Sequence, residues 1–194
     1  MSSELVVADA SAWHTWLAEH HRDSDGVWLV LAKKDVTTPT SLTYDQALEE
    51  ALCHGWIDGQ RNGRDKHTFQ QRFTPRRARS LWSKRNVGII ARMEQEGRMV
   101  PAGREQVERA KADGRWDQAY GGSSELEVPA DLADALAAVP RAQAMFDILT
   151  SSNRFAVVFR VTSPKRAETR ARRIAQIVDQ LARGETIYPQ KRTL

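Results

Sequence analysis

The spacing of apolar side chains predicts a helix and then a buried strand near the start of the chain. Trp13 and Leu17 recur at helical intervals behind Asp9, a residue that suits the N-cap position. Segment 26–34 is rich in β-branched and aromatic residues, which favour a buried strand.

A second helix and a hairpin are predicted next. Thr43 can cap the helix, and Gly55 lies where a terminal glycine is expected, because glycine tolerates a positive φ. Segments 56–60 and 67–73 bracket Asn62-Gly63, a dipeptide that favours a tight turn between two strands. We expect this hairpin to pair with the preceding strand.

The pattern then becomes helical again. Ser80 can cap a helix that ends at Gly97, and a shorter helix over 102–113 stops at Gly114. Segment 120–124 is rich in glycine and serine and is therefore the best candidate for a linker.

The remaining sequence is predicted to be helical. Pro129 and Pro140 each suit the first turn of a helix, where no amide hydrogen is needed. Segment 155–161 has the composition of a strand, but Ser151-Ser152 can cap a helix there and no partner strand is evident. We therefore predict a helix over this segment.

A stripe of apolar residues predicts a final helix from Ser163-Pro164 to Gly184. Together these patterns predict an α+β fold, in which a small antiparallel sheet of about three or more strands packs with helices and precedes a helical C-terminal lobe. We expect an α+β lobe over 1–120, a linker over 121–127 and a helical lobe over 128–194 packed on the first. One compact domain is the alternative.

Composition is typical of a soluble globular protein. Of the 194 residues, 41% are apolar and 28% are charged, and no stretch approaches the roughly 18 consecutive apolar residues of a membrane helix. The N-terminal sequence lacks the basic and apolar regions of a secretory signal, so we expect a cytoplasmic protein without a membrane span. The single cysteine, Cys53, excludes an internal disulfide and a zinc site built from several cysteines.

Basic residues are concentrated in two clusters within a chain of net charge +4. The first comprises Arg72, Arg76, Arg77, Arg79, Lys84 and Arg85, and the second comprises Lys165, Arg166, Arg170, Arg172 and Arg173. Such clusters attract phosphates, nucleic acid or acidic surfaces. They can equally be solvated faces, or arginines stacked on tryptophans.

The motif HGWIDGQ begins at His54 and contains several polar groups. His54 and Asp58 are candidates for a catalytic acid–base pair, although a histidine at a helix end can simply donate to carbonyl groups. Side chains alternate along a strand, so Trp56, Asp58 and Gln60 are expected to share an open face if Ile57 points into the core. That face would suit a binding site, or it is plain solvent-exposed surface.

A strand, a basic loop and a helix start follow one another over 73–86. Backbone amides at a helix start attract anions, and an arginine can bind phosphate or carboxylate through two parallel hydrogen bonds. Cations at this end of a helix oppose its dipole by a few tenths to about 1 kcal/mol, which a bound anion would offset. Internal acids such as Asp58 or Asp65 could instead neutralise the arginines. The candidate ligand-binding residues are Trp56, Asp58, Gln60, Arg61, Arg76, Arg77, Trp82, Ser83, Lys84, Arg85 and Asn86.

No motif indicates a metal or a cofactor, and we expect neither. The five histidines lack the spacing of a zinc site, and the glycine-rich nucleotide motifs are absent. Cys53 lies in an apolar neighbourhood and is expected to be buried rather than nucleophilic. Basic tracts interleaved with Phe69, Phe73 and Trp82 are compatible with nucleic acid, but no known binding module is present.

Four linked motifs resemble the YdeI/OmpD-associated (OmdA) family, which is labelled as bacteriocin protection. They are HGWIDGQ, FQQRFTPRRARSLWSKRNV, GRMVPAGREQVERAKADGRWDQAY and PKRAETRARRIAQIVDQLARGE. The resemblance covers the chain from about Trp13 to Tyr188. It implies a link to antimicrobial peptides and envelope stress, and it supplies no catalytic residues.

Three functions follow as hypotheses. The first is a non-catalytic cytoplasmic protein that binds an anionic ligand or an acidic partner through segment 76–86, beside the open strand face. The second is an enzyme in which His54 and Asp58 act on a small anionic substrate held by Arg61, Lys84 or Arg85. The third is nucleic-acid binding by the two basic clusters. The sequence leaves the oligomeric state open.

Overall fold

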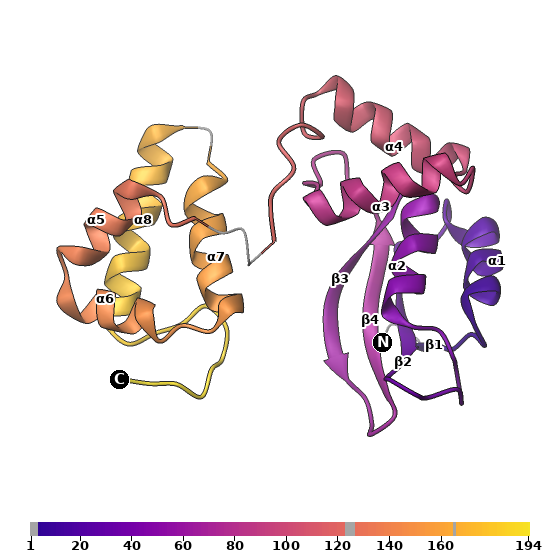
Figure 1. Cartoon of the computed structure of the whole chain (residues 1–194), viewed down its shortest axis with the longest axis horizontal. Helices are drawn as coiled ribbons and strands as arrows, with labels where there is room; N and C mark the ends of the chain where they lie inside the picture. Colours follow the sequence, from indigo (N-terminus) through magenta and orange to yellow (C-terminus); the bar gives the residue numbers. More distant parts are fainter. Residues whose placement is uncertain (1–3, 123–126, 165) are drawn as a thin grey trace. The chain divides into compact units, whose positions relative to one another are not determined.

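The computed structural model describes residues 4–122, 127–164 and 166–194 (Figure 1). Contacts within the chain divide it into two compact units, Met1–Tyr120 and Gly121–Leu194. Most of the linker expected over 121–127 lies outside the described residues. The α+β prediction is confirmed: among the described residues, the first unit contains the sheet and four helices, and the second unit is helical.

A four-stranded sheet forms the centre of the first unit. In spatial order its strands are β1 (Glu4–Leu5), β2 (Val27–Ala32), β4 (Thr68–Pro75) and β3 (Trp56–Gly63). The β2–β4 and β4–β3 pairs are antiparallel, whereas β1 runs parallel to β2. The expectation of a purely antiparallel sheet is therefore wrong at this edge, because a two-residue strand is too short to produce an alternating pattern.

The hairpin turn lies beyond Asn62-Gly63 rather than on it. Gly63 still belongs to β3, and residues 64–67 make the connection. The carboxylate of Asp65 accepts hydrogen bonds from the amides of His67 and Thr68 at 2.8 and 2.7 Å. The hydrogen bond from the Thr68 hydroxyl, followed by these two amide bonds, holds the pKa of Asp65 well below its usual range. The side chain of Asp65 thus organises the turn that Asn62-Gly63 was expected to form.

The four helices of the first unit are α1 (Ala10–His20), α2 (Tyr44–Cys53), α3 (Lys84–Gln95) and α4 (Pro101–Ala112). Helix α2 is central, since it contacts β2, β3 and each of the other three helices (Figure 1). The predicted caps of the first two helices are confirmed: Asp9 accepts from the amide of Ala12, and Thr43 forms a reciprocal capping box with Gln46.

Helix α3 is capped three residues later than expected. The Ser83 hydroxyl accepts from the amide of Asn86 at 3.2 Å, while the Ser80 hydroxyl accepts from the amide of Arg77 in a preceding turn. Serine is a favourable N-cap residue at both positions, but only Ser83 comes after the turn that Ser80 closes. The residues between them, including Trp82, therefore lie before the helix rather than on its buried face.

The second unit contains α5 (Ala130–Ala137), α6 (Pro140–Asp147), α7 (Ser151–Thr162) and α8 (Ala167–Ala182). Helix α8 contacts the other three (Figure 1). A separate core includes Leu132, Met145, Val161 and Leu181. The predicted helix over 155–161 is confirmed as part of α7, although Thr150 caps it. Helix α8 begins at Ala167, later than the expected Ser163-Pro164.

The described helices include none long and apolar enough to cross a membrane.

Candidate functional site

The HGWIDGQ motif joins the end of α2 to the start of β3. Gly55 has φ +76°, and a Cβ at this position would lie 3.0 Å from the carbonyl oxygen of Ala102 on α4. Glycine is therefore required both for the turn and for the close approach of α4. The His54 side chain is buried, and its Nδ1 donates to the carbonyl of Glu50 at 3.1 Å. Burial lowers the pKa of His54, so its imidazole is neutral at pH 7.

Trp56 lies in the core rather than on an open strand face. The side chain is 1% exposed, and its indole N–H donates to the carbonyl of His21 at 3.1 Å. Its ring meets those of Trp13 and Trp16 edge-on, at centroid distances of 6.3 and 5.8 Å. The expected open face of Trp56, Asp58 and Gln60 is therefore wrong, because α1 packs over Trp56.

Asp58 and the residues after it have different surroundings. Asp58 is half-buried and accepts from the Tyr44 hydroxyl at 2.8 Å. A β-bulge between Asp58 and Arg61 interrupts the alternation of side chains before Gln60. Gln60 is exposed, and the guanidinium of Arg61 lies 3.9 Å from the ring centroid of Phe69.

The structure does not bring His54 and Asp58 together. His54 bonds to Glu50 near the C-terminal end of α2, whereas Asp58 bonds to Tyr44, the first residue of that helix. A ten-residue helix is about 15 Å long. The two side chains therefore have separate partners at opposite ends of α2, and no acid–base pair is assembled.

Arg76 and Trp82 form a buried stack before α3. The guanidinium carbon lies 3.5 Å from the indole centroid, and the two residues are 7% and 2% exposed. Nη1 of Arg76 donates to the carbonyl of Leu81 at 3.2 Å. Nε and Nη2 of Arg76 and Nε1 of Trp82 have no hydrogen-bond partner within the described part of the chain. All three are donors, so the stack presents buried donors without an acceptor.

The charge of Arg76 is incompletely compensated. Burial lowers its pKa to about 10, while the charges that Tyr120 and Asp58 can carry act in the opposite direction. Arg76 takes part in no ion pair among the described residues. The nearby Arg85, by contrast, is paired with Asp45 at 2.7 Å. Arg76 therefore remains cationic at neutral pH in a desolvated position, where a charge is normally paired.

A cavity of about 300 Å³ lies beside Arg76. Its lining includes His21, His54, Trp56, Arg76, Glu105 and Gln106, and we call it the Arg76 cavity. Nε2 of His21 is also buried without a partner, and the rings of His21 and His54 are 5.5 Å apart. The volume of the Arg76 cavity is at the lower end of the range for small-molecule sites.

The backbone amides at the start of α3 are largely occupied. The amide of Lys84 donates to the carbonyl of Tyr120 at 2.8 Å, and that of Asn86 donates to Ser83. The helix start expected to bind an anion thus has fewer free donors than the sequence indicates. The donors that lack an acceptor belong instead to the adjoining Arg76–Trp82 stack.

The other basic candidates of this segment lie away from the Arg76 cavity. Arg85 lies 5.2 Å from the ring centroid of Tyr44 and is paired with Asp45. Arg77 is exposed in the turn closed by Ser80. Neither Arg77 nor Arg85 lines the cavity.

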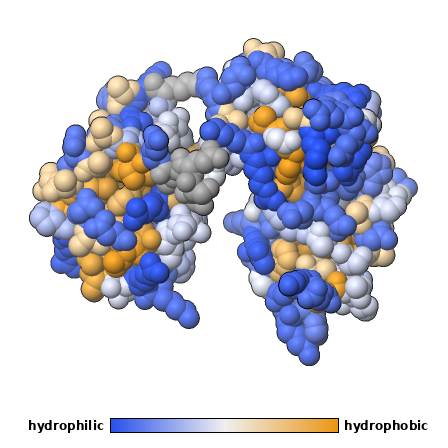
Figure 2. All heavy atoms as spheres, in the orientation of Figure 1, coloured by the Kyte–Doolittle hydropathy of each residue, from blue (hydrophilic) through white to orange (hydrophobic). Residues whose placement is uncertain are grey.

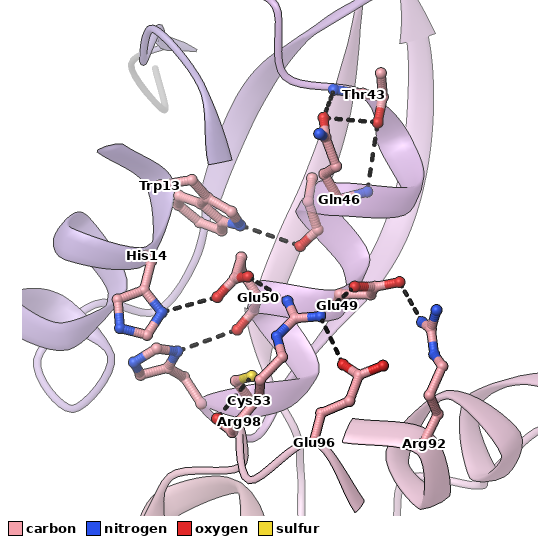
Figure 3. Close-up of polar contacts among 12 residues, drawn as sticks. Trp13, His14, Thr43, Gln46, Glu49, Glu50, Cys53, Arg92, Glu96 and Arg98 are labelled. Carbon is pink, nitrogen blue, oxygen red and sulfur yellow. Dashed lines mark hydrogen bonds and ion pairs between the residues drawn. The ribbon is translucent and has the colours of Figure 1, made fainter. Parts of the chain in front are cut away.

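A second polar network lies at the C-terminal half of α2 (Figure 3). Glu50 binds His14 at 2.8 Å and Arg98 at 2.7 Å, and Arg98 also binds Glu49 at 2.8 Å. The thiol of Cys53 donates to the carbonyl of Arg98 at 3.4 Å. Cys53 is buried, as predicted, and this burial raises the pKa of its thiol to about 12, so the thiol is protonated at neutral pH. The network ties α1 and α2 to the connection between α3 and α4.

Sequence reasoning missed His21 and Tyr44. No motif marks Tyr44 as a site residue, because periodicity does not distinguish a phenol from a hydrocarbon ring. Burial and then the neighbouring Asp58 raise the pKa of Tyr44, so it is a hydrogen-bond donor at neutral pH. His21 follows the first helix without any motif, and only the tertiary fold places it beside His54.

The second basic cluster belongs to the second unit. Arg170 forms two hydrogen bonds to Asp131 at 2.6 and 2.7 Å, and Arg173 donates to the carbonyl of Arg160 at 2.7 Å. Lys165 lies outside the described residues. Within the described ranges there is no group of three or more acidic, histidine or cysteine side chains that could hold a metal ion.

Two family models match the sequence. One is described as a domain of unknown function (DUF8412) and matches residues 5–106, more than half of the chain. The other is described as bacteriocin-protection, YdeI or OmpD-associated (OmdA), and matches residues 125–184. The OmdA resemblance is thus shown for the C-terminal part only, and HGWIDGQ lies in the DUF8412 match rather than in an OmdA region that extends back to Trp13. Neither the curated proteins nor the solved structures include a match.

Proposed function

We propose that this chain, which belongs to the DUF8412 family and matches OmdA in its C-terminal part, binds a small anionic ligand at the Arg76 cavity. The observation that carries the proposal is the Arg76–Trp82 stack, whose three buried donors have no acceptor in the described chain. A buried guanidinium without a paired carboxylate and with two unbonded nitrogens is costly, and a bound anion would reduce that cost.

The free edge of Arg76 favours a carboxylate or a phosphate. Nη1 is already bonded to Leu81, which leaves Nε and Nη2. These two nitrogens lie on the same edge of a guanidinium and form the fork that binds two oxygen atoms in parallel. The indole N–H of Trp82 is a further unbonded donor of the stack, although Trp82 itself does not line the cavity. Two anionic oxygens on one atom match this set of donors better than a single hydroxyl or carbonyl group does.

The cavity lining also favours an anion over a cation. The cationic side chains of the lining are Arg22 and Arg76, against the single carboxylate of Glu105. The volume of about 300 Å³ limits the ligand to a small molecule. The ligand is therefore expected to be a small carboxylate or phosphate compound rather than a polymer.

We propose that the protein is cytoplasmic, and that its cellular role is linked to protection against antimicrobial peptides or related envelope stress. The family description of the C-terminal match supports the second part of this proposal. A single buried thiol is compatible with a reducing compartment. The enzyme hypothesis required an acid–base pair, and His54 and Asp58 do not form one. No observation favours the nucleic-acid hypothesis over the anion-binding hypothesis.

Binding is tested by thermal shift and calorimetry with inorganic phosphate and with acetate, using chloride at equal ionic strength as the reference. Arg76→Met removes the free donors but keeps an aliphatic chain against Trp82, and Arg77→Met is the matched control at the exposed neighbouring position. We expect at least one anion to raise the melting temperature of the unmodified chain and of Arg77→Met, but not of Arg76→Met. No response to either anion, or an equal response in both variants, would contradict the proposal.

A further inference from the structure

Two imidazole rings, those of His21 and His54, line the Arg76 cavity. Apolar side chains reach the surface of both units in Figure 2, as they do in most soluble proteins, so they indicate no particular ligand. A polar atom that is buried without a partner is more informative. Nε2 of His21 is such an atom.

The hydrogen bonds of the two rings determine which ring nitrogen carries the proton. Nδ1 of His21 lies 2.9 Å from the carbonyl oxygen of Leu17, and Nδ1 of His54 lies 3.1 Å from that of Glu50. A carbonyl oxygen only accepts, so Nδ1 is the donor in both rings. In a neutral imidazole Nε2 is then unprotonated and presents a lone pair that accepts a hydrogen bond.

Neither of these acceptors has a donor within the described part of the chain. Nε2 of His21 is buried without a partner, and the ring of His54 is bonded there through Nδ1 alone. The ring centroids lie 5.5 Å apart, and both residues line the cavity of about 300 Å³ that Arg76 also lines. A single small molecule in this cavity can therefore contact Arg76 and an imidazole at once.

The surroundings of His54 keep its ring neutral. His14 lies at a ring-centroid distance of 4.9 Å, in addition to His21 at 5.5 Å. The carboxylate of Glu50 is already bound to His14 and Arg98, as Figure 3 shows. Burial lowers the pKa of His54 most, and the two neighbouring histidines act in the same direction.

The charged groups of the cavity favour a hydroxyl group over an ammonium group as the donor to these rings. Arg22 and Arg76 are cationic, and the carboxylate of the lining belongs to Glu105, an exposed residue. An ammonium group beside two arginines would be repelled, and a solvated carboxylate would offset little of that repulsion. A hydroxyl group donates its hydrogen without adding a charge.

We propose that the ligand of the Arg76 cavity is a small anion that also carries a hydroxyl group, which donates its hydrogen to Nε2 of His21 or His54. The inference rests on the proposed function, because Arg76 holds the anionic end. It adds the two imidazoles as the groups that select a hydroxylated ligand over its parent without the hydroxyl. Hydroxycarboxylates and hydroxylated phosphate esters share this chemistry.

Calorimetry of the full chain at pH 8, where an ordinary histidine is neutral, tests this selection. In the carboxylate arm, 2-hydroxypropionate and 3-hydroxypropionate are compared with propionate. In the phosphate arm, 2-hydroxyethyl phosphate is compared with ethyl phosphate. We expect a hydroxylated compound of at least one arm to bind about tenfold more tightly than its parent, because a lone acceptor gains a partner. Alanine, which has an ammonium group in place of the hydroxyl, should bind more weakly than 2-hydroxypropionate.

Asparagine variants separate the imidazole acceptors from Arg76. The amide nitrogen of asparagine can replace Nδ1 as the donor to a carbonyl group, but the side chain does not extend to the position of Nε2. The double variant His21→Asn/His54→Asn should bind the parent anion as tightly as the unmodified chain does, and should lose the preference for the hydroxyl. Gln106→Ala removes another polar group of the cavity wall and should keep the preference.

The measurements on the unmodified chain decide the matter even if a variant does not fold. Parent anions that bind without any preference for a hydroxyl would overturn the inference and leave the proposed anion site standing. Alanine that binds as tightly as 2-hydroxypropionate would also overturn it, as would a preference that survives the double asparagine variant. Absence of binding by every compound would overturn the proposed function together with the inference.

The number of protons taken up on binding gives an independent test. It is obtained by repeating the calorimetry in a second buffer with a different heat of ionisation. We expect no proton uptake at pH 8, because the imidazoles act as neutral acceptors. Uptake of a proton with each ligand would mean that an imidazolium donates to the anion, and this would overturn the inference.

Discussion

Arg76 and Arg170 belong to the two basic clusters of the chain, yet their environments are opposite. Arg170 lies at the edge of the second unit and is held by both oxygens of Asp131. Arg76 is buried in the first unit against Trp82, with two of its nitrogens unbonded. Similar runs of arginine in a sequence can thus produce a balanced structural pair in one place and an unbalanced cation in another. We propose a ligand only for the unbalanced one.

The largest effect is expected from removal of the aromatic partner of Arg76. Trp82→Ala should lower the free energy of unfolding of the first unit by about 3–5 kcal/mol, because a fully buried indole is lost and a cavity remains. Urea unfolding followed by tryptophan fluorescence measures this unit alone, since all six tryptophans lie in it. Leu81→Ala, at an exposed neighbour, should change the value by less than about 0.5 kcal/mol.

A smaller effect is expected at the cap of the helix that follows the stack. Ser83→Ala should lower the free energy of unfolding by about 1 kcal/mol, because the amide of Asn86 loses its acceptor. Ser80→Ala should have a smaller effect, since Ser80 closes a turn rather than a helix. Equal losses in the two variants would show that the cap has been misassigned.

The two arginines are expected to respond differently to the same substitution. Arg76→Met should change the free energy of unfolding by less than about 1 kcal/mol, because it removes an uncompensated charge together with its favourable contacts. Arg170→Met should cause a small loss, confined to the second unit and detected by circular dichroism. A loss of several kcal/mol in Arg76→Met would mean that the protein itself satisfies this cation.

The smallest effect is expected from mild acid. Burial lowers the pKa of His54 below its ordinary 6.5, so the unfolded chain binds a proton more readily than the folded one. The stability of the first unit should therefore be complete above pH 6.5 and should decrease as the pH falls below it. His54→Gln should reduce this slope. The second unit contains no histidine and should show no corresponding change between pH 7 and pH 5.

Much of the fold could be predicted because local signals determine it. Asp9 and Thr43 cap the helices that follow them, and Gly55 adopts the positive φ expected at a helix end. The sequence predictions were wrong where a tertiary contact or a neighbouring side chain overrode the local pattern. Asp65 organises the hairpin turn in place of Asn62-Gly63, and α1 covers Trp56, which strand alternation alone placed on an open face.

The candidate site could be predicted only as a region. The sequence predicts the basic segment before α3 as a candidate region, and this segment contains the Arg76–Trp82 stack; ligand binding there stays a prediction. Sequence order does not show which arginine of a cluster becomes buried, because that depends on the strand end and on the Arg77–Ser80 turn that carry Arg76 inward. The unbonded edge of Arg76 is a property of the folded chain alone.

A crystal of the full chain soaked in bromide tests the central claim most directly. We predict an anomalous peak within hydrogen-bond distance of Nε and Nη2 of Arg76, displaced when acetate is added in excess. Arg76→Met crystals should lack this peak and retain any others. Density for a carboxylate of the protein itself on the free edge of Arg76, or an edge that stays empty at high bromide, would contradict the account.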